Sequence, residues 1–289
     1  MEKIKEYSVD YAISKDGTKI GYKIFGQGPK IILVHGGLMS SQNFTVLAKK
    51  LSENFTVYVP DRRGRGLSSE TKNHSLMAES EDIQAIIDKT NVENIFGLSS
   101  GAIITIKATL ETPKLKKIAI HEPPITNNWE TTNKWYQNYE LAINQNNYGK
   151  AFIHILKGLR EKSLMTILPQ FLVVTILNLG IENQKVVSDE TSLKELISLW
   201  ESDFRIAIES KGLIEKCKEL EDRDVLLLEG EKSYKWLKEI TKTLTIILPE
   251  AEHKELKKCA HNAADNSEKP IIIAEALKDF FIDVKDACR

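Results

Sequence analysis

The sequence predicts an α/β protein with a mostly parallel β-sheet whose faces are covered by helices. Short apolar runs alternate with longer helical stretches over the first 122 residues, and the same alternation returns after residue 223. Strands of a parallel sheet are buried on both faces, so they read as continuous apolar runs, and the crossovers between them are helices. We therefore expect one sheet domain, interrupted by a long helical insertion.

An antiparallel hairpin is expected at the start of the chain. Segments Tyr7–Ile13 and Lys19–Phe25 alternate between apolar and polar residues, and Asp16 and Gly17 between them suit a tight turn. Four apolar runs follow, separated by helical stretches, and each predicts a strand. These runs are Ile31–Val34, Phe55–Val59, Val92–Phe96 and Lys117–Ile120.

The strand signals stop after residue 122 and return at about residue 224. We therefore assign residues 1–122 and 224–289 to the sheet domain and residues 123–223 to a helical cap. The longest apolar run of the cap, Phe171–Leu177, is far shorter than the roughly 20 residues that span a membrane, and we expect it in a buried helix. Beyond the cap the pattern predicts a strand, a helix, a weak strand and a closing helix. They are Val225–Leu228, Tyr234–Thr241, His253–Leu256 and Ile271–Ile282.

Length and composition limit the classes of partner. A chain of 289 residues fits one α/β domain with one inserted subdomain. Its 40 Lys and Arg residues nearly balance its 41 Asp and Glu residues, so no single-sign field favours nucleic acid or an anionic membrane surface. Cys217, Cys259 and Cys288 lack metal-ligand spacing and are expected to be free thiols. We expect no metal or cofactor, and the charged residues 1–6 favour a cytoplasmic location.

The strongest chemical signal is the segment Gly97–Gly101, which reads Gly-Leu-Ser-Ser-Gly. It follows an expected strand and precedes a helical stretch, and this pattern in that context is typical of a nucleophile elbow, a sharp turn that presents a serine hydroxyl. Ser99 is therefore the candidate nucleophile. The backbone N–H of Ser100, at a helix N-terminus, is a candidate donor to an oxyanion. The alternative is an ordinary glycine-rich turn.

A second loop, His35–Gly37, follows the first parallel strand, at the edge of the sheet where α/β proteins place their ligands. Gly37 has no Cβ and lets the backbone approach a substrate closely, so its N–H is the second oxyanion donor that we expect. His35 lies inside the glycine turn, and we interpret it as a structural hydrogen-bonding residue.

A third segment, Asp61–Ser68, reads Asp-Arg-Arg-Gly-Arg-Gly-Leu-Ser. It lies between the two loops in the sequence, and with these three segments in this order the chain resembles the α/β-hydrolase superfamily. The resemblance covers nearly the whole chain. It implies a mostly parallel eight-stranded sheet, with the cap inserted after the sixth strand. It also implies that the Asp61–Ser68 loop is structural and that its arginines are turn and surface residues.

The general base of this family is a histidine in the loop after the last strand, and His253 and His261 are the candidates. His253 falls within the expected last strand. His261 falls on the loop before the closing helix, so we choose His261; the alternative is a solvated loop histidine.

The third catalytic residue departs from the commonest family pattern. Ser233 stands three residues beyond a glycine, where a carboxylate is expected after the seventh strand, and a serine cannot stabilise an imidazolium in the same way. Some branches of the family supply the acid directly after the sixth strand, and Glu122 stands there. Glu122 is our choice and Glu231 the alternative, whereas Asp224 and Glu229 fall before or within a strand.

With serine as the nucleophile, the resemblance implies acyl transfer through an acyl-enzyme, most commonly from a carboxylic ester. Haloalkane dehalogenation would need an aspartate at position 99. Hydrolysis of a lactone, an amide or a carbon–carbon bond, and perhydrolysis, stay open, as does a non-catalytic ligand-binding protein of the same fold. The tryptophans of the cap suggest a mainly apolar pocket for a small molecule, although they could instead form the cap's own core.

Overall fold

The computed structural model describes residues 6–126, 129–159, 165, 168–187 and 189–282. Cys288 and residues 1–5, which carried two of the expectations above, lie outside the described residues. Cys217 and Cys259 are buried free thiols.

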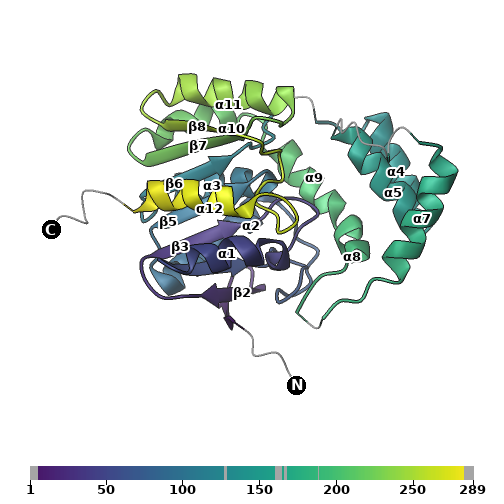
Figure 1. Ribbon diagram of the computed structural model, residues 1–289, viewed down its shortest axis with the longest axis horizontal. Coiled ribbons are helices and arrows are strands. Elements are labelled where there is room, and N and C mark those ends of the chain that lie inside the picture. The colour runs from purple at the N-terminus through teal and green to yellow at the C-terminus, as the bar shows by residue number, and fades with distance from the viewer. Residues whose placement is uncertain (1–5, 127–128, 160–164, 166–167, 188, 283–289) are drawn as a thin grey trace.

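One sheet of eight strands forms the centre of the fold (Figure 1). The strands are β1 (Ser8–Ile13), β2 (Lys19–Phe25), β3 (Lys30–Val34), β4 (Thr56–Pro60), β5 (Asn94–Leu98), β6 (Lys117–His121), β7 (Asp224–Gly230) and β8 (Glu252–Leu256). Their order is β1-β2-β4-β3-β5-β6-β7-β8. β2 pairs antiparallel with β1 and β4, and the other pairings are parallel. The predicted α/β class and mostly parallel eight-stranded sheet are confirmed.

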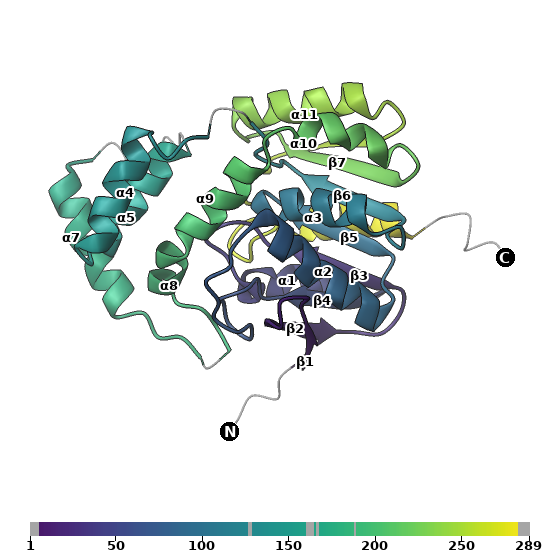
Figure 2. The same ribbon diagram turned by 180° about the vertical axis from the view of Figure 1, so that it is seen from behind.

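Helices cover both faces of this sheet (Figures 1 and 2). α1 (Thr45–Leu51) and α12 (Pro270–Phe281) pack together on one face, next to the short helix η1 (Ser41–Phe44). α2 (Leu76–Thr90), α3 (Ser100–Glu111) and α11 (Lys235–Ile247) pack on the other face. The strands between the two layers are buried on both sides, which explains why they read as continuous apolar runs in the sequence.

The parallel strands end at one edge of the sheet, and the candidate residues follow them there. Leu98 of β5 is level with His121 of β6, so Ser99 and Glu122 begin adjacent loops. The loop after β8 carries His261 to the same edge. Residues far apart in the sequence thus meet where an open α/β sheet binds its ligands.

Residues 123–223, called the insertion below, connect β6 to β7, and their described regular elements are helices. These are α4 (Lys134–Asn144), α5 (Tyr148–Gly158), α7 (Gln170–Glu182), α8 (Leu193–Ser198), α9 (Trp200–Glu209), α10 (Leu213–Lys216) and η2 (Cys217–Leu220). α4, α5 and α7 lie to one side of the sheet domain, and α9 lies between them and it (Figures 1 and 2).

α9 belongs to two apolar clusters. Trp200 and Phe204 pack with Tyr136 and other residues of the insertion. Ile206 and Ala207, on the same helix, pack with the residues of α2 and α3 in the main core. α9 is therefore fixed to the sheet domain and also supports the rest of the insertion.

The expectation that Phe171–Leu177 lies in a buried helix is wrong in one respect. The segment forms most of α7, but Phe171, Leu172 and Ile176 are 72%, 52% and 69% exposed. α7 packs on α5 along a single side, where Ile181 is buried, and its opposite side faces outward. No helix in the described part of the chain is long and apolar enough to cross a membrane.

Candidate active site

Ser99 sits on a sharp turn between β5 and α3. Its φ of 56° and ψ of −123° are strained for a residue with a side chain. Two hydrogen bonds hold this turn: Ser99 N–H donates to the carbonyl of His121 at 2.9 Å, and Ser99 C=O accepts the N–H of Ala102 at 2.9 Å. The turn also requires Gly101, because a Cβ there would collide with the carbonyl oxygens of Val34 and His35. The sequence therefore forms a tight elbow with the hydroxyl at its tip.

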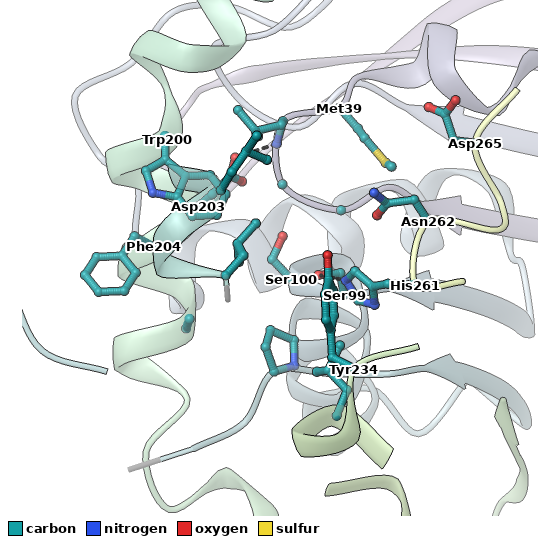
Figure 3. A pocket seen from close by; sticks show the side chains of 18 of the residues that line it. Met39, Ser99, Ser100, Trp200, Asp203, Phe204, Tyr234, His261, Asn262 and Asp265 are labelled. Carbon is teal, nitrogen blue, oxygen red and sulfur yellow. Dashed lines mark hydrogen bonds between the residues drawn. The ribbon is translucent and has the colours of Figure 1, made fainter. Parts of the chain in front are cut away.

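His261 lies beside this hydroxyl (Figure 3). Its Nε2 lies 3.0 Å from Ser99 Oγ, and its Nδ1 lies 2.6 Å from Glu122 Oε2. The ring of Tyr234 lies 5.9 Å from the imidazole, centroid to centroid. The structure thus joins a hydroxyl, an imidazole and a carboxylate in the order needed to remove a proton from the hydroxyl.

Glu122 is fully buried beside the imidazole. Gly230 N–H donates to its Oε1 at 2.7 Å, and Ser233 Oγ donates to its Oε2 at 2.5 Å. Burial alone would raise the pKa of Glu122, but the hydrogen bonds from His261 and Ser233 and the nearby imidazoles lower it to about 2. The carboxylate is therefore ionised at neutral pH.

The alternative residues lie elsewhere. Glu231 is exposed, and its Oε2 accepts the N–H of Lys258 at 2.7 Å. His253 is within β8, where its Nε2 lies 3.6 Å from Glu229 Oε1. Asp224 is exposed at the first residue of β7. Of the residues weighed from the sequence as acid or base, the structure thus brings His261 and Glu122 to Ser99.

Gly37 and Ser100 lie beside Ser99 and line the same cavity. Within the described chain, neither backbone N–H donates a hydrogen bond to another residue. His35 is fully buried: its Nδ1 lies 2.9 Å from the carbonyl of Gly36, and its Nε2 accepts the N–H of Arg62 at 3.3 Å. Burial and the charges of nearby arginines hold the pKa of His35 well below its ordinary value, so it is neutral.

The arginines of the Asp61–Ser68 loop are buried, and their assignment as surface residues is wrong. Each guanidinium can be buried because a carboxylate from another element pairs with its charge. The pairs, with their shortest N–O distances, are Arg62–Glu79 at 2.5 Å, Arg63–Asp82 at 2.5 Å and Arg65–Asp203 at 2.7 Å. Arg62 also donates to Asp203 at 2.7 Å. Asp203 was not among the residues predicted from the sequence. It lies 141 residues from Arg62, and no local pattern indicates that the two side chains pair.

A cavity of about 600 Å³ opens over Ser99, between the sheet domain and the insertion (Figure 3). Its volume is typical of a small-molecule site. Most of the side chains that line it are aromatic or aliphatic, and they come from both parts of the chain. They include Met39, Trp129, Phe152, Leu156, Trp200, Phe204, Tyr234 and Trp236. Polar side chains that line it are Asn43, Ser99, Ser100, Asp203, His261, Asn262, Asp265, Ser267 and Glu268.

Comparison with known proteins shows the family of the chain. Residues 29–203 match the family described as alpha/beta hydrolase fold. The chain belongs to this family. Among curated proteins, it is similar to the "Uncharacterized hydrolase YraK" of Bacillus subtilis, with 34% identity over 37% of the chain and 42% of that protein. The chain thus spans less than half the length of this curated relative.

Solved structures of α/β hydrolases share the fold over nearly the whole chain. An alpha/beta hydrolase from Sphaerobacter thermophilus has a TM-score of 0.73 and 23% identity, covering 94% of this chain and 100% of that one. The esterase RhEst1 from Rhodococcus has a TM-score of 0.68 and 18% identity, covering 94% and 98%. At these identities the likeness concerns the fold.

Proposed function

We propose that this protein is a serine hydrolase that cleaves a small, mainly apolar carboxylic ester through an acyl-enzyme. Membership of the α/β hydrolase family supports a hydrolytic activity. The observation that carries the finer proposal is the continuous contact from Ser99 Oγ through His261 to Glu122, at the floor of a largely apolar cavity.

In the first half of the proposed reaction, His261 Nε2 takes the proton of Ser99 Oγ as the oxygen attacks the ester carbonyl. Glu122 stabilises the resulting imidazolium. The carbonyl oxygen, now negative, accepts the N–H groups of Gly37 and Ser100. The imidazolium then gives its proton to the leaving alcohol, and the acyl group stays on Ser99.

In the second half, a water molecule gives a proton to His261 and attacks the acyl group. The acid leaves, and the proton returns to Ser99 Oγ. In this scheme residues 1–122 and 224–289 are the catalytic core and the insertion is its cap. The aromatic side chains of the cap favour an apolar acyl or alcohol group, because each polar group buried there without a partner costs free energy.

Labelling with a fluorophosphonate tests the nucleophile. An activated serine attacks electrophilic phosphorus as it attacks a carbonyl, so we expect one modified residue, Ser99, in the peptide map. Ser99→Ala is the matched control and should take up no label at this position. A label on Ser100 or Ser233 with none on Ser99 would overturn the assignment.

A substrate panel tests the bond that is cleaved. Wild-type protein and Ser99→Ala are compared on p-nitrophenyl butyrate, a matched thioester, a lactone and an anilide. We expect the ester to have the highest kcat/KM and the variant to have none above background. A labelled Ser99 with a faster lactone or amide would keep the mechanism and correct the substrate. A binding protein without activity would turn over none of the four.

A further inference from the structure

Asp203 lies at the point where the insertion meets the loop that carries Gly37. It is on α9, and it is 3% exposed. Its Oδ2 accepts the N–H of Leu38 at 3.0 Å (Figure 3), and its Oδ1 accepts Arg62 Nη1 and Arg65 Nη2, both at 2.7 Å. Burial would raise the pKa of Asp203, but the two arginines and these hydrogen bonds lower it, so the carboxylate is charged.

The contact with Leu38 restrains the backbone beside Gly37. Leu38 has a φ of 55°, a left-handed conformation that is strained for a leucine and persists only where its surroundings impose it. Gly37 itself packs directly on α9: a Cβ at this position would lie 3.2 Å from Asp203 Cγ and 3.1 Å from Trp200 Cζ3. One helix of the insertion therefore determines where this loop runs.

Arg62 extends the same restraint to the second candidate oxyanion donor. Its Nη1 donates to Ser100 Oγ at 3.1 Å and approaches the carbonyl of Gly36 at 3.5 Å. Two hydrogen bonds to Glu79, at 2.5 and 2.9 Å, fix the other side of the guanidinium. A network anchored on α9 and α2 thus contacts the side chain of Ser100 and the backbone on either side of Gly37, at Gly36 and Leu38.

Stability alone is a weak explanation for this network. Two arginines and two carboxylates balance in charge, yet a buried ion cluster commonly stabilises a protein no more than apolar residues of the same volume. Its contacts with the backbone at Gly36 and Leu38 are what an apolar replacement could not supply.

We propose that Asp203 is a positioning residue for the oxyanion hole, and this inference rests on the proposed function. By accepting the N–H of Leu38, Asp203 fixes the peptide between Gly37 and Leu38. By pairing with Arg62, it also holds the guanidinium that approaches the carbonyl of Gly36, and this carbonyl belongs to the peptide that carries the Gly37 N–H. The insertion then does more than enclose the substrate, because its helix α9 orders a donor that acts on the transition state.

A pair of double variants isolates the accepting oxygen. Asp203→Leu with Arg65→Met removes one charge of each sign, so that Arg62 and Glu79 stay paired, and it removes the acceptor of the Leu38 N–H. Asp203→Asn with Arg65→Met has the same charge balance but keeps an acceptor oxygen. The two proteins differ only at residue 203, which makes the asparagine variant the conservative rescue.

Two probes separate transition-state binding from substrate binding. p-Nitrophenyl butyrate gives kcat and KM. 1,1,1-Trifluorooctan-2-one gives an inhibition constant for the tetrahedral state, since Ser99 Oγ adds to the ketone, the serine proton passes to His261, and the ketone oxygen becomes an oxyanion. We expect the leucine variant to lose kcat by roughly 10- to 100-fold relative to the asparagine variant, with a matching rise in the inhibition constant and little change in KM.

Equal kcat in the two variants would overturn the inference, as would a loss confined to KM with an unchanged inhibition constant. Thermal unfolding of both proteins serves as the folding control, and Asp203→Ala with Arg65→Met replaces the leucine variant if it does not fold. Hydrogen exchange of the Leu38 amide in the wild-type protein is an independent measurement, and rapid exchange would contradict the proposal.

Failure of the proposed function can be distinguished from failure of the role proposed for Asp203. If the wild-type protein neither hydrolyses the ester nor takes up fluorophosphonate at Ser99, both proposals are wrong. If the wild-type protein is active and the two variants behave alike, only the role of Asp203 is wrong.

Discussion

Glu122 reaches His261 from the end of β6 in an uncommon backbone conformation. Its φ is 48°, and the left-handed region costs a residue with a side chain on the order of 1 kcal/mol. Hydrogen bonds from Gly230 and Ser233 hold the carboxylate and offset this cost. Ser233, in the position where the commonest family pattern has the acid, thus donates to the carboxylate that we propose as the acid, which directly follows β6.

Replacing this carboxylate should cost far more than replacing its nearest alternative. We expect Glu122→Gln to lower kcat by about 10²- to 10⁴-fold, because a neutral amide cannot stabilise the imidazolium of His261. Glu231→Gln should cost about tenfold or less, since Glu231 is exposed and accepts the N–H of Lys258. Steady-state rates on p-nitrophenyl butyrate measure both changes.

The order of the two losses decides the assignment. A larger loss in Glu231→Gln would move the acid to Glu231, and near-wild-type rates in both variants would mean that neither glutamate alone is required. Circular dichroism of Glu122→Gln is the folding control, because Glu122 is buried.

At the scale of elements, the burial of the strands could be predicted from the sequence more easily than the burial of the helices. The run Ile31–Val34 is fully buried, as a continuous apolar run between two helical layers must be. α7 is apolar on every side, so its sequence has no period that would distinguish the side packed on α5 from the side facing outward. The helix could be predicted from composition, whereas its exposed side required the position of α5.

The two sides of α7 should respond differently to truncation. Ile181 is 5% exposed and packs in the cluster of the insertion, so Ile181→Ala should lower the free energy of unfolding by about 2–4 kcal/mol. Ile176 is 69% exposed, and Ile176→Ala should change it by about 0.5 kcal/mol or less. Urea unfolding followed by tryptophan fluorescence measures both, since three of the four tryptophans, Trp129, Trp135 and Trp200, lie in the insertion. A comparable loss in Ile176→Ala would show that the outer side of α7 is covered in solution.

At the scale of the whole molecule, the motifs predicted which residues meet at the candidate site but not what surrounds them. Ser99 and His261 could be predicted as candidates from order along the chain, because each follows a strand at the same edge of the sheet. The pairing of Asp203 with Arg62 and Arg65 depends on how the insertion folds back over that edge, and no local pattern encodes it. The lining of the cavity is likewise a property of the assembled chain.

The charge of that lining predicts which substrates are rejected. Within the described chain, no lysine or arginine lines the cavity, whereas Asp203, Asp265 and Glu268 do, and of these Asp203 is paired with Arg62 and Arg65. The carboxylate of Asp265 accepts Asn43 Nδ2 at 2.7 Å, and Glu268 is exposed. A carboxylate on the substrate would therefore lose hydration among apolar side chains, gain no cationic partner and meet two negative charges.

Two esters of matched length test this exclusion. p-Nitrophenyl butyrate is neutral, whereas p-nitrophenyl hemisuccinate ends in a carboxylate. We expect kcat/KM to be at least about tenfold lower for the hemisuccinate, since an unpaired buried charge costs several kcal/mol before it shifts or finds water. Glu268→Gln and added salt should each reduce the difference in kcat/KM between the two esters. The substitution removes an exposed negative charge, and salt ions screen such a charge from the substrate. Equal kcat/KM values for the two esters would mean that a cationic group reaches the bound substrate, and the proposal of a mainly apolar substrate would then be wrong.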